Sequence, residues 1–377
     1  MKAKPQRTCD VVVLGGGVIG MLTARALAAE GRKPVVVERD RLGRGASRAA
    51  GGIMSPLAPW EVDPAVHALA KVSLPMLPGL ATALETDTGI DPEYRRTGVL
   101  FLDCADHEQA LAYAERTGEA VRVLAPKDVA NFEPAAARVE GPSVLFPDLA
   151  QVRNPRLLDA LAKDLRLKGV EVLEDAGEAR LETAGAGLAV VSDTHGRLAA
   201  PDVVLAAGAW SGEVAKGVGL ELPVVPVRGQ IIWYQAPEAG VRHVIIRDGK
   251  YVVPRQEGVV LVGSTLEEVG FDPGTTPEAR SLLEAAARNV VPLLSTLPVQ
   301  GHWSGLRPGA PNGVPFIGEA PGVPGLWLNT GHFRNGVNLA PGSVALLTDL
   351  MSGRKTPLDP IAYDPDRRMA PAGVSVL

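Results

Sequence analysis

The chain opens with a hydrophobic pattern that predicts a strand, a tight turn, a helix and a second strand. Val11–Leu14 is a short, continuous apolar run, as in parallel strands that are buried on both faces. Between residues 18 and 30 the apolar side chains recur at helical spacing, and Gly31 supplies a stop signal. Residues 35–37 form another apolar run, which ends at Glu38. The segment therefore predicts a β-α-β unit.

The pattern changes in the middle of the chain and later returns to its first form. Between residues 223 and 270, short apolar runs alternate with turn residues, which predicts antiparallel strands. A helix over residues 69–84 should be kinked or split by Pro75 and Pro78. The other predicted elements are strands at 99–102, 170–173, 203–205, 230–234, 243–246, 251–254, 259–262 and 326–328, and helices at 108–116, 155–168, 278–291 and 342–351.

These elements predict an α/β fold in which an antiparallel-sheet domain is inserted into a Rossmann-type dinucleotide-binding domain. The length of 377 residues suits two domains at roughly 150 residues each. We assign residues 1–85, 145–222 and 301–377 to the discontinuous Rossmann-type domain. Residues 86–144 and 223–300 then form the inserted domain, where a substrate would bind.

Composition narrows the classes of protein to which the chain can belong. Its 42 glycines and 32 prolines predict many tight turns, while 46% hydrophobic residues exclude a disordered chain. The net charge of −5, with no basic cluster, argues against a nucleic-acid partner. The chain has only two cysteines, Cys9 and Cys104, and its six histidines lack ligand spacing. Neither a disulfide scaffold nor a metal site is therefore expected.

The amino terminus superficially resembles a secretory signal, because Lys2, Lys4 and Arg7 precede the first apolar run. Glycines interrupt that run, however, and no stretch reaches the roughly 18 apolar residues that a membrane span requires. We therefore expect a cytoplasmic protein without a membrane span. A homo-oligomer is compatible with the sequence.

The strongest chemical signal is the glycine fingerprint Gly15-x-Gly17-x-x-Gly20 between the first strand and its helix. The first glycine permits the tight turn, the second lets the backbone approach a pyrophosphate, and the third permits close contact between helix and strand. The amino terminus of the helix stabilises the phosphate charge. Glu38, at the end of the next strand, is suited to bind a ribose hydroxyl. The fingerprint predicts a dinucleotide site without separating NAD from FAD; the alternative is a glycine-rich turn with a surface glutamate.

Four further segments favour FAD over NAD, because they resemble segments of a known protein family. They are residues 46–56 (ASRAAGGIMSP), 250–255 (KYVVPR), 303–308 (WSGLRP) and 331–336 (GHFRNG). With the fingerprint they resemble, almost end to end, the glycine oxidase and D-amino-acid oxidase family of FAD flavoproteins, especially the bacterial glycine oxidases of thiamine biosynthesis. The resemblance implies a Rossmann-type FAD-binding domain. It also implies a non-covalent flavin, because the related sarcosine oxidases attach theirs to a late cysteine and no cysteine follows Cys104.

The resemblance also implies which residues form the site. Arg307 would clamp the substrate carboxylate, Tyr251 would hydrogen-bond to it, and Arg334 would lie near substrate and flavin. Without the resemblance, Arg307 also fits a structural ion-pair partner and Tyr251 a core aromatic residue. The residues expected to bind FAD are Gly15, Gly17, Val18, Ile19, Gly20, Glu38, Arg39, Ala46, Ser47, Gly51, Gly52, Ile53, Glu178, Gly208, His332, Phe333, Arg334, Asn335, Gly336 and Val337.

The activity that the resemblance implies is oxidative deamination of glycine or another small amine or D-amino acid. Hydride transfer to the flavin would give an imino acid, which water converts into an oxo acid and ammonia. Dioxygen would reoxidise the flavin and yield hydrogen peroxide, and the imine would feed thiamine synthesis. Two alternatives stay open. One is a dehydrogenase that passes electrons to a quinone or a protein carrier; the other is a non-catalytic FAD-binding subunit.

Overall fold

The computed structural model describes residues 6–185 and 187–369. Within these ranges a six-stranded sheet has the order β10-β3-β2-β14-β21-β20. Neighbouring strands run parallel, except that β20 is antiparallel to β21. The strands are β2 (Val11–Leu14), β3 (Pro34–Val37), β10 (Glu171–Leu173), β14 (Asp202–Leu205), β20 (Phe316–Glu319) and β21 (Leu326–Thr330).

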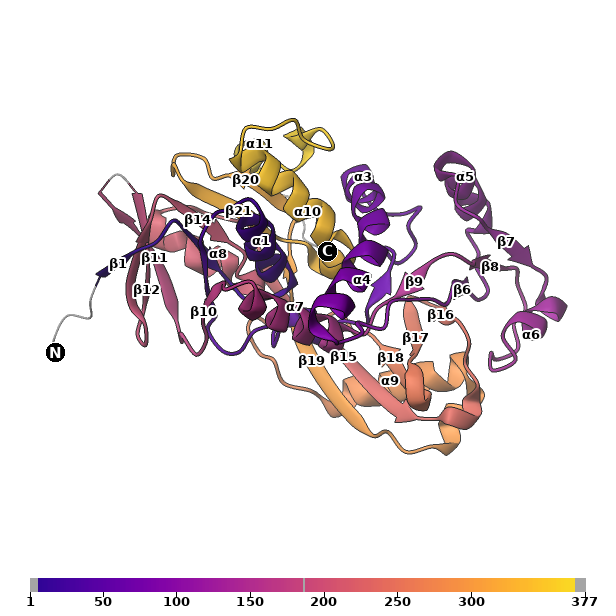
Figure 1. The fold of residues 1–377 in the computed structure, drawn as a ribbon. Coiled ribbons are helices and arrows are strands. Elements are labelled where there is room, and N and C mark those ends of the chain that lie inside the picture. The colour runs from indigo at the N-terminus through magenta and orange to yellow at the C-terminus, as the bar shows by residue number, and fades with distance from the viewer. Residues whose placement is uncertain (1–5, 186, 370–377) are drawn as a thin grey trace.

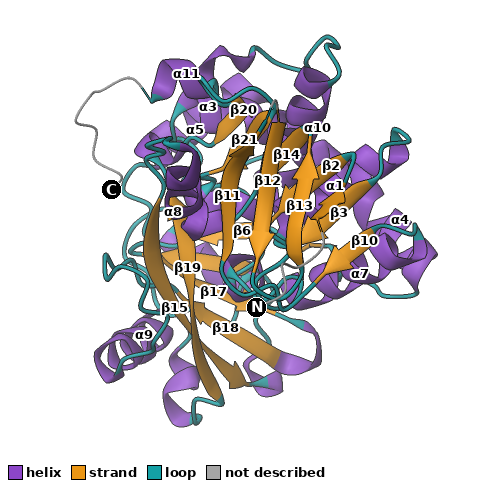
Figure 2. Cartoon of the chain, turned by 90° about the vertical axis from the view of Figure 1, so that its left-hand side faces the viewer, coloured by secondary structure: helices purple, strands orange, loops and turns teal. Residues whose placement is uncertain are grey.

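Helices cover one face of this sheet and a smaller sheet covers the other (Figure 2). Because both faces are covered, all four residues of β2 are buried, as its continuous apolar run predicts. The helices are α1 (Val18–Ala29), α7 (Asn154–Leu167) and α10 (Gly336–Met351), with α3 (Pro64–Ser73) and α4 (Leu77–Thr88) packed against them. The smaller sheet has the order β1-β13-β12-β11, formed by β1 (Gln6–Thr8), β11 (Ala179–Ala184), β12 (Gly187–Ser192) and β13 (Gly196–Ala200).

A second large sheet has eight strands in the order β19-β15-β18-β17-β16-β6-β8-β7 (Figure 1). It is antiparallel except for the pair β16 and β6. Helix α9 (Pro277–Val290) packs on one face and α5 (His107–Thr117) on the other. The strands are β6 (Val99–Phe101), β7 (Arg122–Leu124), β8 (Ser143–Phe146), β15 (Val225–Gln235), β16 (Val244–Arg247), β17 (Lys250–Pro254), β18 (Val259–Gly263) and β19 (Gly301–Gly309).

Smaller elements complete the described chain. A three-stranded sheet joins β4 (Ile53–Met54), β9 (Ala150–Gln151) and β5 (Arg95–Arg96). The short helices are α2 (Ala46–Ala49), α6 (Val129–Phe132), α8 (Ser211–Ala215) and α11 (Pro365–Arg368).

The structure confirms most of the predicted elements and corrects several. The helix predicted at 69–84 is divided into α3 and α4 by a 3-10 turn, Leu74–Met76, because Pro75 lacks the N–H group that would continue α3. Helix α10 begins at Gly336, earlier than predicted. Residues 46–49, for which no helix is predicted, form one helical turn. Strands β11 to β13 had no predicted counterpart, since their apolar alternation is short and interrupted by turns.

Two strands of the eight-stranded sheet, β8 and β19, lie at or across the domain boundaries that the sequence predicts. Strand β19 pairs along its length with β15, so Gly301–Gly309 lies in the eight-stranded sheet, although the sequence groups it with the Rossmann-type segments. Strand β8, Ser143–Phe146, spans the assumed boundary between residues 144 and 145. We propose the same two domains, with β8 and β19 assigned to the inserted one.

The described ranges contain neither a membrane-spanning helix nor a candidate metal cluster. No helix in the described ranges is both long and apolar enough to cross a membrane. The same ranges contain no cluster of three or more histidine, cysteine or acidic side chains placed to hold a metal ion. Cys9 and Cys104 are free and buried.

Candidate active site

A cavity of about 1410 Å³ lies where the carboxyl ends of β2, β3, β14 and β21 face the eight-stranded sheet. Ligands of open parallel sheets bind at this edge, because the loops after the strands and the amino termini of the helices meet there. Every residue that the sequence proposes for the site lines the cavity, except Gly20. The fold therefore brings together segments that are far apart in the chain.

The turn between β2 and α1 lies too close to neighbouring backbone for a side chain. Gly15 has a φ of +115°, and a Cβ there would overlap the carbonyl oxygen of Ala206. A Cβ at Gly20 would overlap the carbonyl oxygen of Gly15, so Gly20 supports the turn from behind. At the amino terminus of α1, the Val18 N–H donates to Ser47 Oγ at 3.1 Å. The fingerprint thus shapes backbone that faces the cavity.

Glu38 stands at the end of β3 and binds the same turn. Its carboxylate accepts hydrogen bonds from the N–H groups of Gly16 at 2.6 Å and Asp40 at 3.0 Å. Burial raises the pKa of the Glu38 carboxyl, although these two hydrogen bonds oppose the shift. The carboxylate is therefore placed beside the turn, as the sequence predicts for a ribose-binding acid.

Two aromatic residues that sequence reasoning missed form a wall near Glu38. The Arg39 guanidinium lies 4.3 Å from the centre of the Trp210 ring, a cation–π arrangement. Trp210 in turn stacks on Phe271, with 5.5 Å between the ring centres. The sequence contained one indication of Trp210, which closely follows Gly208, a residue predicted to bind the cofactor. Aromatic residues make up only 4% of the chain, so one at this position is conspicuous. Phe271 comes from the loop after β18, which no local pattern assigns to this cavity.

The segment 46–53 is built of small residues and lies against the eight-stranded sheet. Gly51 faces Tyr251, and a Cβ at Gly51 would be 2.9 Å from the tyrosine ring. Arg255, at the end of β17, donates to the Gly51 carbonyl oxygen at 2.6 Å and to Gln151 Oε1 at 2.5 Å. Burial lowers the pKa of Arg255 to about 10. A buried guanidinium therefore fixes the backbone of this segment beside Tyr251.

Tyr251 on β17 and Arg307 on β19 line the cavity from the eight-stranded sheet. Burial raises the pKa of Tyr251 and the nearby Arg307 opposes the shift, so the phenol is neutral at neutral pH. Arg307 Nη2 donates to Ser264 Oγ at 2.7 Å, and Nη1 donates to the Thr265 carbonyl oxygen at 3.2 Å. Within the described ranges no carboxylate forms an ion pair with Arg307. Its neutral partners, which sequence reasoning missed, orient the guanidinium and leave its charge available.

The start of α10 and the end of β21 form the opposite wall. His332 is buried, which lowers its pKa to about 3, and its Nε2 lies 2.9 Å from Ser343 Oγ. Arg334 is exposed and lines the cavity. The side-chain amide of Asn329 and Oδ1 of Asn338 are buried without a hydrogen-bond partner in the described structure. Both asparagines line the cavity, and buried polar atoms of this kind match a polar ligand.

Known proteins with the same architecture are similar along almost the whole chain. A glycine oxidase from Pseudomonas aeruginosa is 44% identical over 360 residues, which cover 95% of this chain and 99% of that protein. A bifunctional ThiO/ThiG protein from Trichormus variabilis is 33% identical over 94% of this chain and 54% of its own length. The crystal structure of glycine oxidase from Geobacillus kaustophilus superposes with a TM-score of 0.89 at 30% identity, covering 95% of this chain and 98% of that one. Residues 10–350 match the model of one family, described as FAD dependent oxidoreductase (DAO), and this chain belongs to that family.

Proposed function

We propose that this protein oxidises glycine, or another small amine or D-amino acid, with FAD as its cofactor. The observation that carries the proposal is the pairing of Arg307 and Tyr251 on one cavity wall. Arg307 has no carboxylate partner within the described ranges, and a guanidinium fork matches a carboxylate through two parallel hydrogen bonds. The similarity to glycine oxidases supports a small amino-acid substrate.

The residues of the cavity fit FAD. The turn at Gly15 and the amino terminus of α1 offer N–H groups for a pyrophosphate, and Glu38 offers acceptors for a ribose. The side-chain amide of Asn329 and Oδ1 of Asn338, which lack hydrogen-bond partners in the described structure, fit the polar edge of a flavin ring. When bound, FAD supplies the two-electron oxidising power for the reaction. We propose that it is held without a covalent bond.

The chain's own side chains bind and orient the substrate. Arg307 and the neutral Tyr251 hydroxyl hold the carboxylate, so that the α-carbon takes a fixed position in the cavity. Burial keeps His332 uncharged and hydrogen-bonded to Ser343, which leaves it unsuited to take a proton from the substrate. We therefore propose that the amine enters in its neutral form and that no side-chain base acts on it. Arg334 lies on the same cavity and adds positive charge near the carboxylate.

The partners of the reaction follow from the same family resemblance. We propose dioxygen as the electron acceptor, hydrogen peroxide as a product, and a homo-oligomer working in the cytoplasm. The similarity to a bifunctional ThiO/ThiG protein agrees with a role of the imino product in thiamine synthesis.

An anaerobic titration followed by a peroxide assay tests the proposal. Glycine, sarcosine, D-alanine, D-proline and bulkier D-amino acids are added to the purified yellow protein, and flavin absorbance is followed. We expect at least one small amine to bleach the flavin and, in air, to release one hydrogen peroxide per amine consumed. Bleaching without peroxide would identify a dehydrogenase. If no amine bleaches the flavin, a non-catalytic FAD-binding subunit becomes the better description.

Substituting Gly229 should weaken substrate binding through Arg307. Gly229 on β15 lies directly against the guanidinium, and a Cβ there would overlap its carbon and both terminal nitrogens. We expect Gly229→Ala to raise KM roughly tenfold or more, because the guanidinium must leave its hydrogen bonds to Ser264 and Thr265. Gly79→Ala in α4, where nothing lies within 4 Å of the added Cβ, is the matched control. Unchanged KM in both variants would argue against this account of Gly229.

A further inference from the structure

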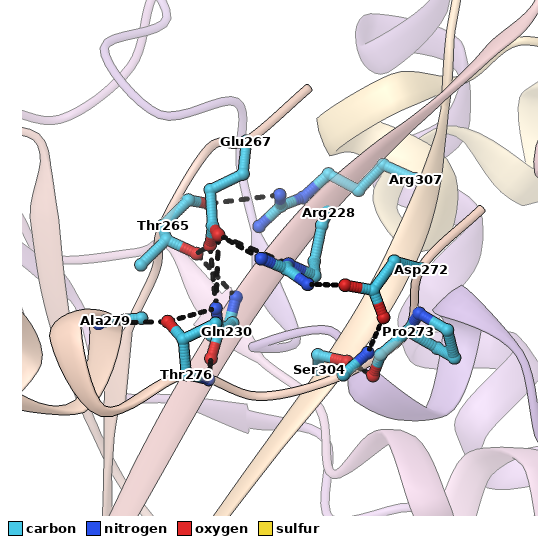
Figure 3. A network of polar contacts seen from close by, with 11 residues as sticks. Arg228, Gln230, Thr265, Glu267, Asp272, Pro273, Thr276, Ala279, Ser304 and Arg307 are labelled. Atoms are coloured by element: carbon cyan, nitrogen blue, oxygen red, sulfur yellow. Dashed lines mark hydrogen bonds and ion pairs between the residues drawn. The ribbon is translucent and has the colours of Figure 1, made fainter. Parts of the chain in front are cut away.

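A network of polar side chains lies behind Arg307 and joins β15, the segment 264–276 and the start of α9 (Figure 3). Its central carboxylate is Glu267, which belongs to neither the predicted cofactor site nor the substrate clamp. We propose that Glu267 is a positioning residue: through Thr265 it fixes the two oxygen acceptors that orient Arg307 for a substrate carboxylate. The inference rests on the proposed function and adds a residue to it.

The link between Arg307 and this network is direct. Both acceptors of the guanidinium come from adjacent residues, the Ser264 hydroxyl at 2.7 Å and the Thr265 carbonyl oxygen at 3.2 Å. These two residues follow β18 immediately, so the direction of the guanidinium depends on where this short stretch of backbone is held. Any group that fixes Thr265 therefore also fixes Arg307.

Thr265 is held on both sides of its hydroxyl. The hydroxyl donates to Glu267 Oε1 in a short hydrogen bond and accepts from the Gln230 N–H at 2.9 Å. The Thr265 N–H donates to the Gln230 carbonyl oxygen at 3.3 Å. Thr265 is 8% exposed and Gln230 is fully buried. Because water does not compete at these positions, the contacts with Glu267 and Gln230 determine the position of Thr265.

Glu267 is in turn fixed by charge and by backbone pairing. Its Oε2 accepts from Arg228 Nη2 at 2.6 Å and Nε at 3.2 Å, and its Oε1 accepts from Gln230 Nε2 at 2.9 Å. Backbone hydrogen bonds of 2.9 and 3.0 Å join Arg228 and Glu267 in both directions. Although burial opposes it, hydrogen bonds from Thr265 and Arg228 lower the pKa of Glu267, which keeps the carboxylate ionised and able to accept from all its donors.

The far side of the network is anchored on a regular helix. Gln230 Oε1 accepts from the Thr276 N–H at 3.0 Å, and Thr276 Oγ1 caps α9 by accepting from the Ala279 N–H at 3.2 Å. On the solvent side, Arg228 Nη1 donates to Asp272 at 2.7 Å. A guanidinium held by neutral acceptors is thus supported by β15 and α9, two rigid elements on which precise positioning depends.

Two near-isosteric substitutions test the proposal in the holoenzyme. Glu267→Gln removes the charge that organises Arg228 and Thr265, and Thr265→Val removes the hydroxyl but keeps the carbonyl that Arg307 uses. The dissociation constant of acetate is measured from the change in flavin absorbance, and KM and kcat are measured with the preferred amine. We expect each variant to raise the acetate dissociation constant and KM roughly tenfold while kcat changes much less. The double variant should be no worse than the poorer single one, because both act through the same contact.

Controls separate positioning from a general loss of structure. Acetamide, which lacks the charge, should bind the variants and the parent protein alike. Asp164→Asn removes the charge of a fully buried carboxylate, paired with Arg25 and Lys168 away from the cavity, and should leave acetate binding unchanged. Unchanged acetate affinity in both test variants would overturn the inference, and so would additive effects or equal losses for acetate and acetamide. If Glu267→Gln fails to fold, Thr265→Val decides the question alone.

The same data distinguish this inference from the proposed function. If the parent protein oxidises no amine and acetate binding still depends on Glu267, the proposed function fails and the positioning role stands. If amines are oxidised with an unchanged KM in Glu267→Gln, the positioning role fails and the function stands.

Discussion

Replacing Arg307 by alanine should remove most substrate oxidation while the protein keeps its flavin. The guanidinium is held by Ser264 and Thr265 and faces the cavity beside Tyr251. No carboxylate in the described ranges forms an ion pair with it. Loss of a desolvated, charge-assisted pair costs about 3 kcal/mol, which corresponds to roughly a hundredfold in kcat/KM. The measurement is steady-state kinetics with the preferred amine, together with the ratio of flavin to protein absorbance.

Two further variants make the result for Arg307 specific. Arg307→Lys keeps the charge but loses the planar fork, so it should fall between the parent protein and Arg307→Ala. Arg354→Ala removes an exposed arginine that pairs with Glu30 and Asp349, and its kinetics should match those of the parent protein. Bound flavin with unchanged kinetics in Arg307→Ala would show that the substrate carboxylate binds elsewhere.

Gly15→Ala should yield protein without flavin. An alanine at a φ of +115° is strained, and its Cβ would also overlap the Ala206 carbonyl oxygen on the neighbouring strand end. Strain of this kind costs on the order of 1–3 kcal/mol before the overlap is counted. Relief requires the turn to move away from β14, and the N–H groups proposed to hold the pyrophosphate move with it. We therefore expect a loss of flavin larger than the loss of folded protein.

Gly31→Ala is the matched control for backbone strain. Gly31 ends α1 at a φ of +82°, but nothing lies within 4 Å of an added Cβ. It should lower Tm by a few degrees, as about 1 kcal/mol would in a chain of this size, and retain flavin. Flavin content and thermal unfolding are measured for both variants. If Gly15→Ala retains as much flavin as Gly31→Ala does, flavin binding does not depend on close approach of the backbone at the turn between β2 and α1.

The opening β-α-β unit was predictable because the sequence patterns that specify it lie close together in the chain. Continuous apolar runs at β2 and β3, helical spacing in α1 and the glycine spacing between them all lie within one short stretch. The residues of that unit that are predicted to bind the cofactor, such as Gly15 and Glu38, therefore line the cavity. Tyr251 and Arg307 came from the family resemblance, since an arginine in an apolar stretch equally fits a structural ion pair.

What escaped prediction depends on contacts between segments. The apposition of Gly229 and Arg307 depends on how β15 and β19 pair, and no local pattern reports that register. The stack of Trp210 on Phe271 joins the residues after β14 to the loop after β18. Helix α10 was predicted to begin later because the pattern gave no signal at Gly336, where tertiary contacts sustain its first turns. Intrinsic helix propensity is a weak guide to where such a helix begins.

The strand order of the six-stranded sheet has a consequence for the order of events during synthesis. Strand β14 lies between β2 and β21, so the last of these partners leaves the ribosome long after the first. A nascent chain that ends before β21 and α10 has an unpaired edge on β14 and lacks the cavity wall that carries Asn329 and Asn338. We therefore expect cofactor capture to be a late event in biogenesis, and a premature stop before β21 to remove one wall of the proposed flavin site instead of trimming an appendage.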